Sequence, residues 1–252
     1  IYKNIDSLLS SRYFGKFLSD FAQILPLGGL KKNILLTKKE IANNKIQLSS
    51  YPYKGVLNLT DACNQRCRFC EIHYIFQKYP KQYPNFIDLE ILKKYYPLLA
   101  QMKFLDFYGT TGEPLLSPFF PDVIRFLKSK NPEIYLLVNT NGSFLTEINI
   151  KTMVEVGFDE VVISFHAATE KTYQDLVGGN YQKLIDNIRK LAGRRGNKKK
   201  PLIGLTFALN KINAQDALFY PGLAKKLSVD YIHLNHYYHV RNQLSEDVSF
   251  YF

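Results

Sequence analysis

The chain is poor in cysteine and contains no long apolar run. Its 252 residues include three cysteines, all between residues 63 and 70. An odd number of closely spaced cysteines excludes the disulfide framework of a small secreted domain. No apolar run reaches the roughly 18 residues that would predict a membrane span, and no secretory signal is visible at the start. Reduced thiols without an export signal favour a cytoplasmic protein.

The charge balance is basic, with a formal net charge of +11. A positive balance can attract nucleic acid, anionic lipid or an acidic substrate. Much of the charge is clustered at Lys38–Lys39, Lys93–Lys94 and residues 194–200. Such runs are typical of solvated surface, and none of the common nucleic-acid-binding motifs is present. A nucleic-acid partner is therefore disfavoured, although not excluded.

The three cysteines form one motif, C-x3-C-x2-C, made by Cys63, Cys67 and Cys70. Iron–sulfur clusters are held by cysteine thiolates, normally four, so three would leave one iron without a protein ligand. An open coordination position is typical of a catalytic metal site. The motif therefore predicts an incomplete metal cage that awaits a non-protein ligand. A structural zinc site completed by His73, or three unconnected thiols, are the alternatives.

The motif resembles that of the radical S-adenosylmethionine (radical SAM) superfamily, including an aromatic residue, Phe69, before the last cysteine. The resemblance implies that Cys63, Cys67 and Cys70 bind a [4Fe–4S] cluster whose fourth iron takes the amino and carboxylate groups of SAM. Reduction then cleaves SAM to methionine and a 5′-deoxyadenosyl radical, which abstracts hydrogen from a substrate. It also implies that Phe69 packs near the adenine, and that an electron donor such as flavodoxin or ferredoxin is a partner.

Strand-like and helix-like segments alternate from residue 56 onwards. The predicted strands are residues 56–60, 104–108, 134–139, 160–165, 202–209 and 231–237. The predicted helices are residues 88–100, 118–130, 146–156, 170–177, 181–193 and 213–227, with Asp88 and Thr146 as N-caps of the first and third. This order predicts an α/β fold with parallel strands and with ligand sites at their carboxyl ends. Six strands match the partial (β/α)6 barrel of the radical SAM family.

An N-terminal helical extension is predicted before this pattern. Apolar residues form one helical face over residues 1–25, Leu-Gly-Gly at 27–29 is expected to end it, and a short helix is expected at 37–43. The predicted domains are a helical lead-in at 1–54, a partial barrel at 55–240 and, at 241–252, the start of a C-terminal segment for which truncation is one interpretation.

The turn GTTGEP (109–114) follows the second predicted strand. Its glycines allow backbone to approach a ligand closely, and a carboxylate can accept hydrogen bonds from an ammonium group. Without the resemblance, a loop with a helix-capping acid is the simpler interpretation. The family's GGEP stretch binds the SAM amino group, which implies that role for Gly112 and Glu113. Thr110 and Thr111 replace the leading glycines of the family pattern.

The turn NTNG (139–142) follows the third predicted strand. Asn and Gly are ordinary turn residues, so a structural role is a strong alternative. On the active face of the predicted barrel, Asn139, Thr140 and Asn141 become candidates for contacts with the ribose or carboxylate of SAM. The family often has a similar T-N-G sequence here.

Two further strand ends carry polar candidates. Ser164 matches a family serine that contacts SAM, and Asn210 after the fifth strand is a weaker candidate. His166 stands where many relatives have aspartate, and packing and catalysis are equally open for it. In the last strand region, His233 and His239 share a face while His236 takes the other, so pocket lining or packing is favoured over a second metal site.

These features predict a radical SAM enzyme that acts on a peptide or protein. The motifs resemble those of the subgroup that carries a SPASM or twitch extension, many of whose members modify ribosomal peptides. No cysteine follows Cys70, so no cysteine-ligated auxiliary cluster can form on this chain. Two alternatives stay open: a radical SAM enzyme for a small molecule, nucleotide or RNA, and a non-catalytic metal-binding module.

Overall fold

The computed structural model describes residues 28–70, 85–108 and 112–236. The chain divides into two compact units, Ile1–Tyr53 and Lys54–Phe252. Several predictions lie outside the described residues: the helix at 1–25, the segment at 241–252, and the roles of His73, Thr110, Thr111 and His239. None of the described helices combines the length and apolar character needed to cross a membrane.

The described part of the first unit contains one helix, α3, Gly28–Ala42. The prediction that Leu-Gly-Gly at 27–29 ends a helix over 1–25 stays a prediction, because that helix lies outside the described residues; the two glycines are the first residues of α3. Glycine is unfavourable chiefly in a helix interior, so a glycine pair is tolerated in the first turn. The short helix expected at 37–43 is the last part of α3.

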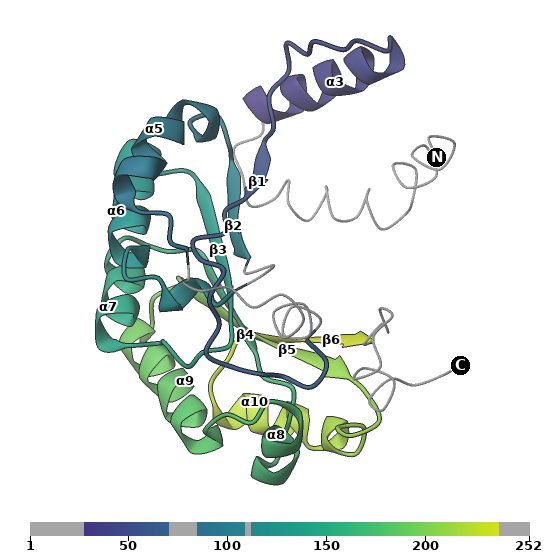
Figure 1. Ribbon diagram of the computed structural model, residues 1–252, viewed down its shortest axis with the longest axis vertical. Coiled ribbons are helices and arrows are strands. Elements are labelled where there is room, and N and C mark those ends of the chain that lie inside the picture. The colour runs from purple at the N-terminus through teal and green to yellow at the C-terminus, as the bar shows by residue number, and fades with distance from the viewer. Residues whose placement is uncertain (1–27, 71–84, 109–111, 237–252) are drawn as a thin grey trace. The chain divides into compact units, whose positions relative to one another are not determined.

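The second unit is built on one sheet of six strands in the order β1-β2-β3-β4-β5-β6 (Figure 1). The strands are β1 Lys54–Val56, β2 Phe104–Tyr108, β3 Tyr135–Thr140, β4 Glu160–Ser164, β5 Leu202–Leu209 and β6 Tyr231–His236. Every neighbouring pair is parallel. The carboxyl ends of all six strands therefore lie at the same edge of the sheet, and the predicted α/β class is confirmed.

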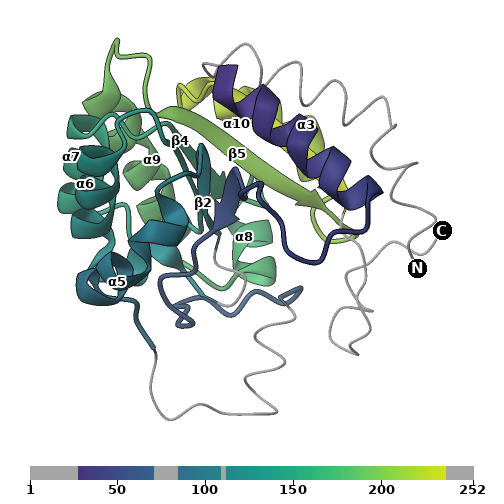
Figure 2. The ribbon, with the colours of Figure 1, turned by 90° about the horizontal axis from the view of Figure 1, so that it is seen from above.

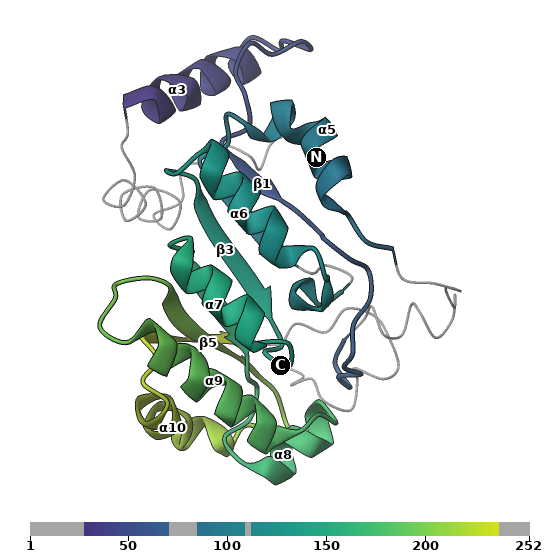
Figure 3. The same ribbon diagram turned by 90° about the vertical axis from the view of Figure 1, so that its left-hand side faces the viewer.

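The helices of the second unit connect these strands. They are α5 Leu89–Leu99, α6 Phe120–Lys130, α7 Glu147–Glu155, α8 Glu170–Leu176, α9 Tyr181–Arg195 and α10 Tyr220–Lys226, with short 3-10 turns η2 Pro114–Leu116 and η3 Asp216–Leu218. Figure 3 shows α6, α7 and α9 side by side over one face of the sheet, and Figure 2 shows α5, α6 and α7 on the same side of β2. The predicted caps are confirmed: Asp88 accepts from the Ile91 N–H and Thr146 from the Asn149 N–H.

The strands alternate between a core face and an opposite polar face, because successive strand residues point to opposite sides. The fully buried residues on the core face include Leu105, Phe107, Leu136, Val138, Val161, Ile163, Ile203, Leu205 and Phe207. Asp106, Asn139 and Ser164 occupy the alternate positions and are only half-buried. The face away from the core thus carries polar side chains toward the carboxyl ends of the strands.

The first strand lies earlier than predicted. The strand expected at 56–60 is β1, Lys54–Val56, because the chain then leaves β2 and pairs elsewhere. The Leu59 carbonyl accepts the Ile87 N–H at 2.9 Å, and Thr60 forms an antiparallel bridge with Phe86. The backbone groups that would extend β1 instead hold the segment that returns from the cysteine region.

The last predicted helix is divided. In place of one helix over 213–227, the chain forms η3 and then α10, Tyr220–Lys226. Pro221 lies in the first turn of α10, where its missing N–H costs no hydrogen bond and its fixed φ favours a new helix start. The apolar pattern predicted one continuous helix here and did not reveal the break between η3 and α10.

Candidate metal centre and cofactor site

The turns after β1 and β2 lie directly against each other. The Glu113 N–H donates to the Ala62 carbonyl at 2.7 Å. A Cβ atom at position 112 would meet the Thr60 carbonyl oxygen at 2.3 Å, so no residue larger than Gly112 fits without moving the backbone. The Gly-Glu-Pro turn is thus packed on the loop that carries Cys63.

The side chain of Glu113 joins the turn after β2 to the turn after β3. It is 2% exposed and accepts hydrogen bonds from Thr140 Oγ1 at 2.5 Å, the Asn141 N–H at 2.7 Å and the Leu115 N–H at 3.1 Å. Burial raises the pKa of Glu113 to about 7. A carboxylate offers about four acceptor positions, so one remains for a ligand ammonium. The contact with the SAM amino group remains a proposal.

The three cysteines lie in the loop between β1 and α5, and Cys63 and Cys70 are close enough to Cys67 to influence it electrostatically. Cys63 is exposed, whereas Cys67 and Cys70 are half-buried. Burial raises the pKa of Cys67 well above its usual range, and the neighbouring Cys70 and Cys63 raise it further. Burial likewise raises the pKa of Cys63. Thiols in this setting stay protonated until a cationic centre displaces the proton.

The donor set suits a cluster with three thiolate ligands. It is all sulfur, and within the described ranges no group of three His, Cys, Asp or Glu side chains is spaced to hold a single metal ion. His73, the residue that would complete a zinc site, lies outside those ranges. The three thiols therefore match a [4Fe–4S] cluster in number and in kind, with Cys63, Cys67 and Cys70 as the residues that would hold it.

Phe69 packs on His166 at the end of β4. Their ring centroids are 5.1 Å apart and the rings are nearly perpendicular, at 79°. The Ala208 N–H donates to His166 Nδ1 at 3.1 Å. Burial lowers the pKa of His166 to about 4, so the ring is neutral at physiological pH. Of the two roles left open for His166, its contacts support packing beneath Phe69.

Replacing His166 with leucine is expected to lower the free energy of unfolding by about 1–3 kcal/mol, because the Ala208 N–H loses its buried acceptor. SAM binding should weaken through displacement of Phe69, while the pH profile of SAM cleavage keeps its shape. Denaturant unfolding and the pH profile from 6 to 9 check this, with Lys190→Leu on the exposed side of α9 as control. Unchanged stability with lost turnover would instead make His166 catalytic.

Asn139 and Ser164 lie on the face opposite the core. Asn139 Nδ2 donates to Asp106 Oδ1 at 3.0 Å, and burial raises the pKa of that carboxyl. Ser164 is half-buried and lies opposite Thr206 in the β4–β5 register. Their predicted contacts with the ribose or carboxylate of SAM stay predictions. Asn210 is 1% exposed and accepts from the Ile212 N–H, so it shapes the turn after β5.

The sequence did not reveal the role of Asp61, whose side chain joins the two ends of the cysteine region. Asp61 accepts from the Asn85 N–H at 2.9 Å and from Asn85 Nδ2 at 2.8 Å. These two bonds tie the beginning of the cysteine loop to the point where the chain returns, 24 residues later. Asp61 stands two residues before Cys63, but no local pattern identifies Asn85 as its partner.

Asp61→Ala is expected to accelerate cluster loss about tenfold, within the range for residues that support metal ligands. The physical reason is that both ends of the loop become free to separate. Iron release to a chelator after anaerobic reconstitution measures the effect. Asp122→Ala, which removes an exposed carboxylate paired with Arg125 on α6, is the control and should release iron at the wild-type rate. Equal rates for both variants would contradict the role of Asp61.

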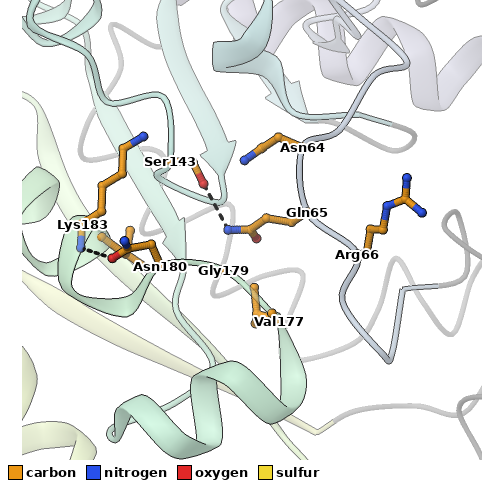
Figure 4. A pocket seen from close by; sticks show the side chains of 10 residues that line it. Asn64, Gln65, Arg66, Ser143, Val177, Gly179, Asn180 and Lys183 are labelled. Atoms are coloured by element: carbon orange, nitrogen blue, oxygen red, sulfur yellow. Dashed lines mark hydrogen bonds between the residues drawn. The ribbon is translucent and has the colours of Figure 1, made fainter.

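A cavity of about 330 Å³ lies beside the cysteine loop (Figure 4). Its lining comes from residues 64–66, Ser143, residues 177–180 and residues 183–184. Gln65 Nε2 lies 3.1 Å from both Ser143 Oγ and the Tyr173 hydroxyl, and Cys67 Sγ lies 3.8 Å from Gln65 Oε1. One side chain, Gln65, thus connects the wall of this cavity to Cys67.

Fold and site together define an α/β protein in which a loop with three cysteines packs against the turn that follows the next strand. The sequence profile of the Radical SAM superfamily matches residues 57–217. The chain therefore belongs to the radical SAM superfamily, whose members are enzymes that use a [4Fe–4S] cluster and SAM. The alternative of a non-catalytic metal-binding module is set aside.

The curated relatives of this chain have names that describe different activities. A tungsten-containing aldehyde ferredoxin oxidoreductase cofactor-modifying protein of Pyrococcus furiosus is 28% identical over 176 residues, which are 68% of this chain and 47% of that protein. A GTP 3′,8-cyclase of Aquifex aeolicus is 29% identical over 126 residues, covering 48% of this chain and 37% of that enzyme. The chain thus spans about half the length of such relatives, or less.

Solved structures support the fold. Streptococcus suis SuiB bound to S-adenosylmethionine superposes with a TM-score of 0.64 at 13% identity, covering 84% of this chain and 46% of SuiB. The enzyme anSMEcpe with bound AdoMet and a peptide gives 0.57 at 19% identity, covering 74% and 52% of the two chains. These likenesses confirm the predicted partial barrel.

Proposed function

We propose that this chain cleaves SAM reductively at a cluster held by Cys63, Cys67 and Cys70, and that the substrate is a peptide or protein. When bound, the cluster and SAM together supply a 5′-deoxyadenosyl radical. The observation that carries this proposal is the direct joining of the cysteine loop to the next two strand-end turns through Gly112 and Glu113. That joining brings together residues that we propose to contact the cluster and the SAM amino group, which supports the proposal.

The proposal gives each remaining site residue a role that is compatible with its position. The Gly112 backbone and the free acceptor position of Glu113 hold the SAM amino group. Asn139 and Ser164, on the polar face, orient the ribose or carboxylate, and Phe69 flanks the adenine. Because these groups are fixed by packing, they can position SAM and exclude water from the reacting atoms. An electron donor of the flavodoxin or ferredoxin type is the proposed reductant.

Two lines support a peptide substrate. SuiB has also been solved bound to its precursor peptide SuiA, with a TM-score of 0.61 to this chain, and anSMEcpe has been solved with a peptide. The polar face also presents Ser164, Thr206 and His233 in register across β4, β5 and β6. Such a row of hydrogen-bonding groups suits an extended polar substrate such as a peptide.

A nucleotide substrate is the second candidate. The observation that favours it is the series of curated relatives named GTP 3′,8-cyclase, one of them 32% identical over 129 residues, half of this chain. The basic charge of the chain is compatible with a triphosphate. This candidate predicts that GTP itself stimulates SAM cleavage.

The two candidates are separated by measuring 5′-deoxyadenosine release by the anaerobically reconstituted, reduced chain. A pool of synthetic peptides and GTP are added in parallel, each in deuterated form. The proposal expects peptides to stimulate release and to pass deuterium into 5′-deoxyadenosine, with GTP inactive. Stimulation and deuterium transfer from GTP alone would overturn the peptide assignment and establish the second candidate.

A further inference from the structure

Two side-chain amides lie against the sulfur atoms of the cysteine loop. Asn141 Nδ2 is 3.9 Å from Cys63 Sγ. Gln65 Oε1 is 3.8 Å from Cys67 Sγ, with the thiol as donor. One amide therefore presents its N–H group to a sulfur, whereas the other presents its oxygen. The two contacts differ in whether the amide group can turn over and exchange the positions of its oxygen and its NH2 group.

The orientation of the Asn141 amide is fixed by its neighbours. Its Oδ1 accepts the Ser143 N–H at 2.9 Å, and a backbone N–H can only donate. The NH2 group must therefore face the other way, toward Cys63 and toward Asn64 Oδ1 at 2.9 Å. Asn141 is 9% exposed, and its own N–H is held by Glu113 Oε2 at 2.7 Å. The donor is positioned before any ligand arrives.

The amide of Gln65 has no such constraint. Its Nε2 contacts the hydroxyl groups of Ser143 and Tyr173, and a hydroxyl can donate as well as accept. Gln65 can therefore turn its amide over when Cys67 loses its proton. Asn141 cannot do so without leaving the Ser143 N–H unpaired. The fixed donor is therefore specific to Asn141 and Cys63.

We propose that Asn141 is a positioning residue that donates an N–H hydrogen bond to the Cys63 sulfur and so raises the reduction potential of the cluster. This inference rests on the proposed function, because it assumes that Cys63 ligates the cluster. Hydrogen bonds to ligand sulfurs favour the more electron-rich reduced state. The contact is part-buried, with the donor on the buried Asn141 side chain, and partial removal from water strengthens its electrostatic effect.

The test is the midpoint potential of the cluster without SAM, followed by electron paramagnetic resonance during a redox titration. Asn141→Leu removes the donor without adding charge. Asn141→Asp keeps the acceptor for the Ser143 N–H but has no donor. Both should shift the reduction equilibrium at least about tenfold toward the oxidised state, or about 59 mV for one electron, with the larger shift for Asn141→Asp because it adds negative charge.

Asn149→Ala is the matched control. This buried asparagine on α7 donates to the Leu115 and Phe144 carbonyls. Its loss should lower the melting temperature and leave the potential unchanged. An unchanged potential in both Asn141 variants, each with a full cluster, would overturn the proposal.

A second measurement needs no Asn141 variant. Wild-type protein is labelled with 15N at its asparagine side chains, and the reduced cluster should then show a hyperfine coupling to 15N. The same coupling should be present in labelled Asn64→Ala, which lacks the neighbouring asparagine amide. Absence of that coupling overturns the inference, even where the Asn141 variants fail to assemble a cluster. A wild-type chain that assembles no cluster would overturn the proposed function itself, so the two failures are distinguishable.

Discussion

Cys67→Ala is expected to reduce bound iron and sulfide after anaerobic reconstitution below about a tenth of the wild-type content, and to abolish SAM cleavage. Metal binding and site assembly are coupled, and no other cysteine in the chain can replace this ligand. Cys67 packs against the hydrophobic core, so the other two thiols cannot move to its position. Iron, sulfide and visible absorbance per chain measure the effect.

Arg66→Ala is the matched control for this prediction. Arg66 is the exposed neighbour of Cys67 in the same loop, and its loss should leave cluster content within the error of the wild type. A Cys67→Ala variant that holds a full, stable cluster would contradict the assignment of the ligands.

Glu113→Ala is expected to lower the free energy of unfolding by about 3 kcal/mol or more, and to weaken SAM cleavage at least about tenfold. The substitution leaves the Thr140 hydroxyl and the Asn141 and Leu115 N–H groups without their buried acceptor, at about 1–3 kcal/mol each. It also separates the turn after β2 from the turn after β3. Urea unfolding and 5′-deoxyadenosine release measure the two effects.

An exposed glutamate provides the control for Glu113. Glu133 lies on the surface, 3.9 Å from Lys103, and pairs of this kind contribute little to stability. Glu133→Ala should therefore unfold and turn over like the wild type. A Glu113→Ala variant with unchanged stability would show that the turns are held together by other contacts.

The free energy of unfolding of the metal-free protein should depend on pH through the ionisation of Glu113. Burial raises its pKa from 4.5 to about 7, so its contribution to stability is fully present below pH 4.5 and is lost as the pH rises through 7. The stability of the wild type relative to Glu113→Gln should therefore fall by about 3 kcal/mol across that range. A difference that grows with pH would mean that the folded state prefers the carboxylate.

Much of the second unit could be predicted from local patterns. Buried strands with helical segments between them define six β/α repeats less the final helix. Asp88 and Thr146 mark helix starts because their side chains can accept from N–H groups within the next turn. The same local logic failed at β1. The backbone of residues 59 and 60 pairs with residues 86 and 87 across the cysteine region, and the periodicity of the sequence does not reveal such a long-range pairing.

The sequence motifs of the site could be predicted, but the hydrogen bonds between them could not. The cysteine spacing and the Gly-Glu-Pro turn identify the chemistry, since each is carried by adjacent residues. The sequence does not show that Glu113 accepts three hydrogen bonds from groups inside the protein, or that the Asn141 amide contacts Cys63. Both facts depend on side chains that lie far apart along the chain and meet only because parallel strands end at one edge.

Release of 5′-deoxyadenosine from SAM tests the proposed function most directly. The chain is reconstituted with iron and sulfide under anaerobic conditions, reduced with dithionite and incubated with SAM beside Cys67→Ala. The prediction is product in excess over enzyme for the wild type and none for the variant. An intact wild-type cluster that shows no spectral change with SAM and releases no 5′-deoxyadenosine would contradict it.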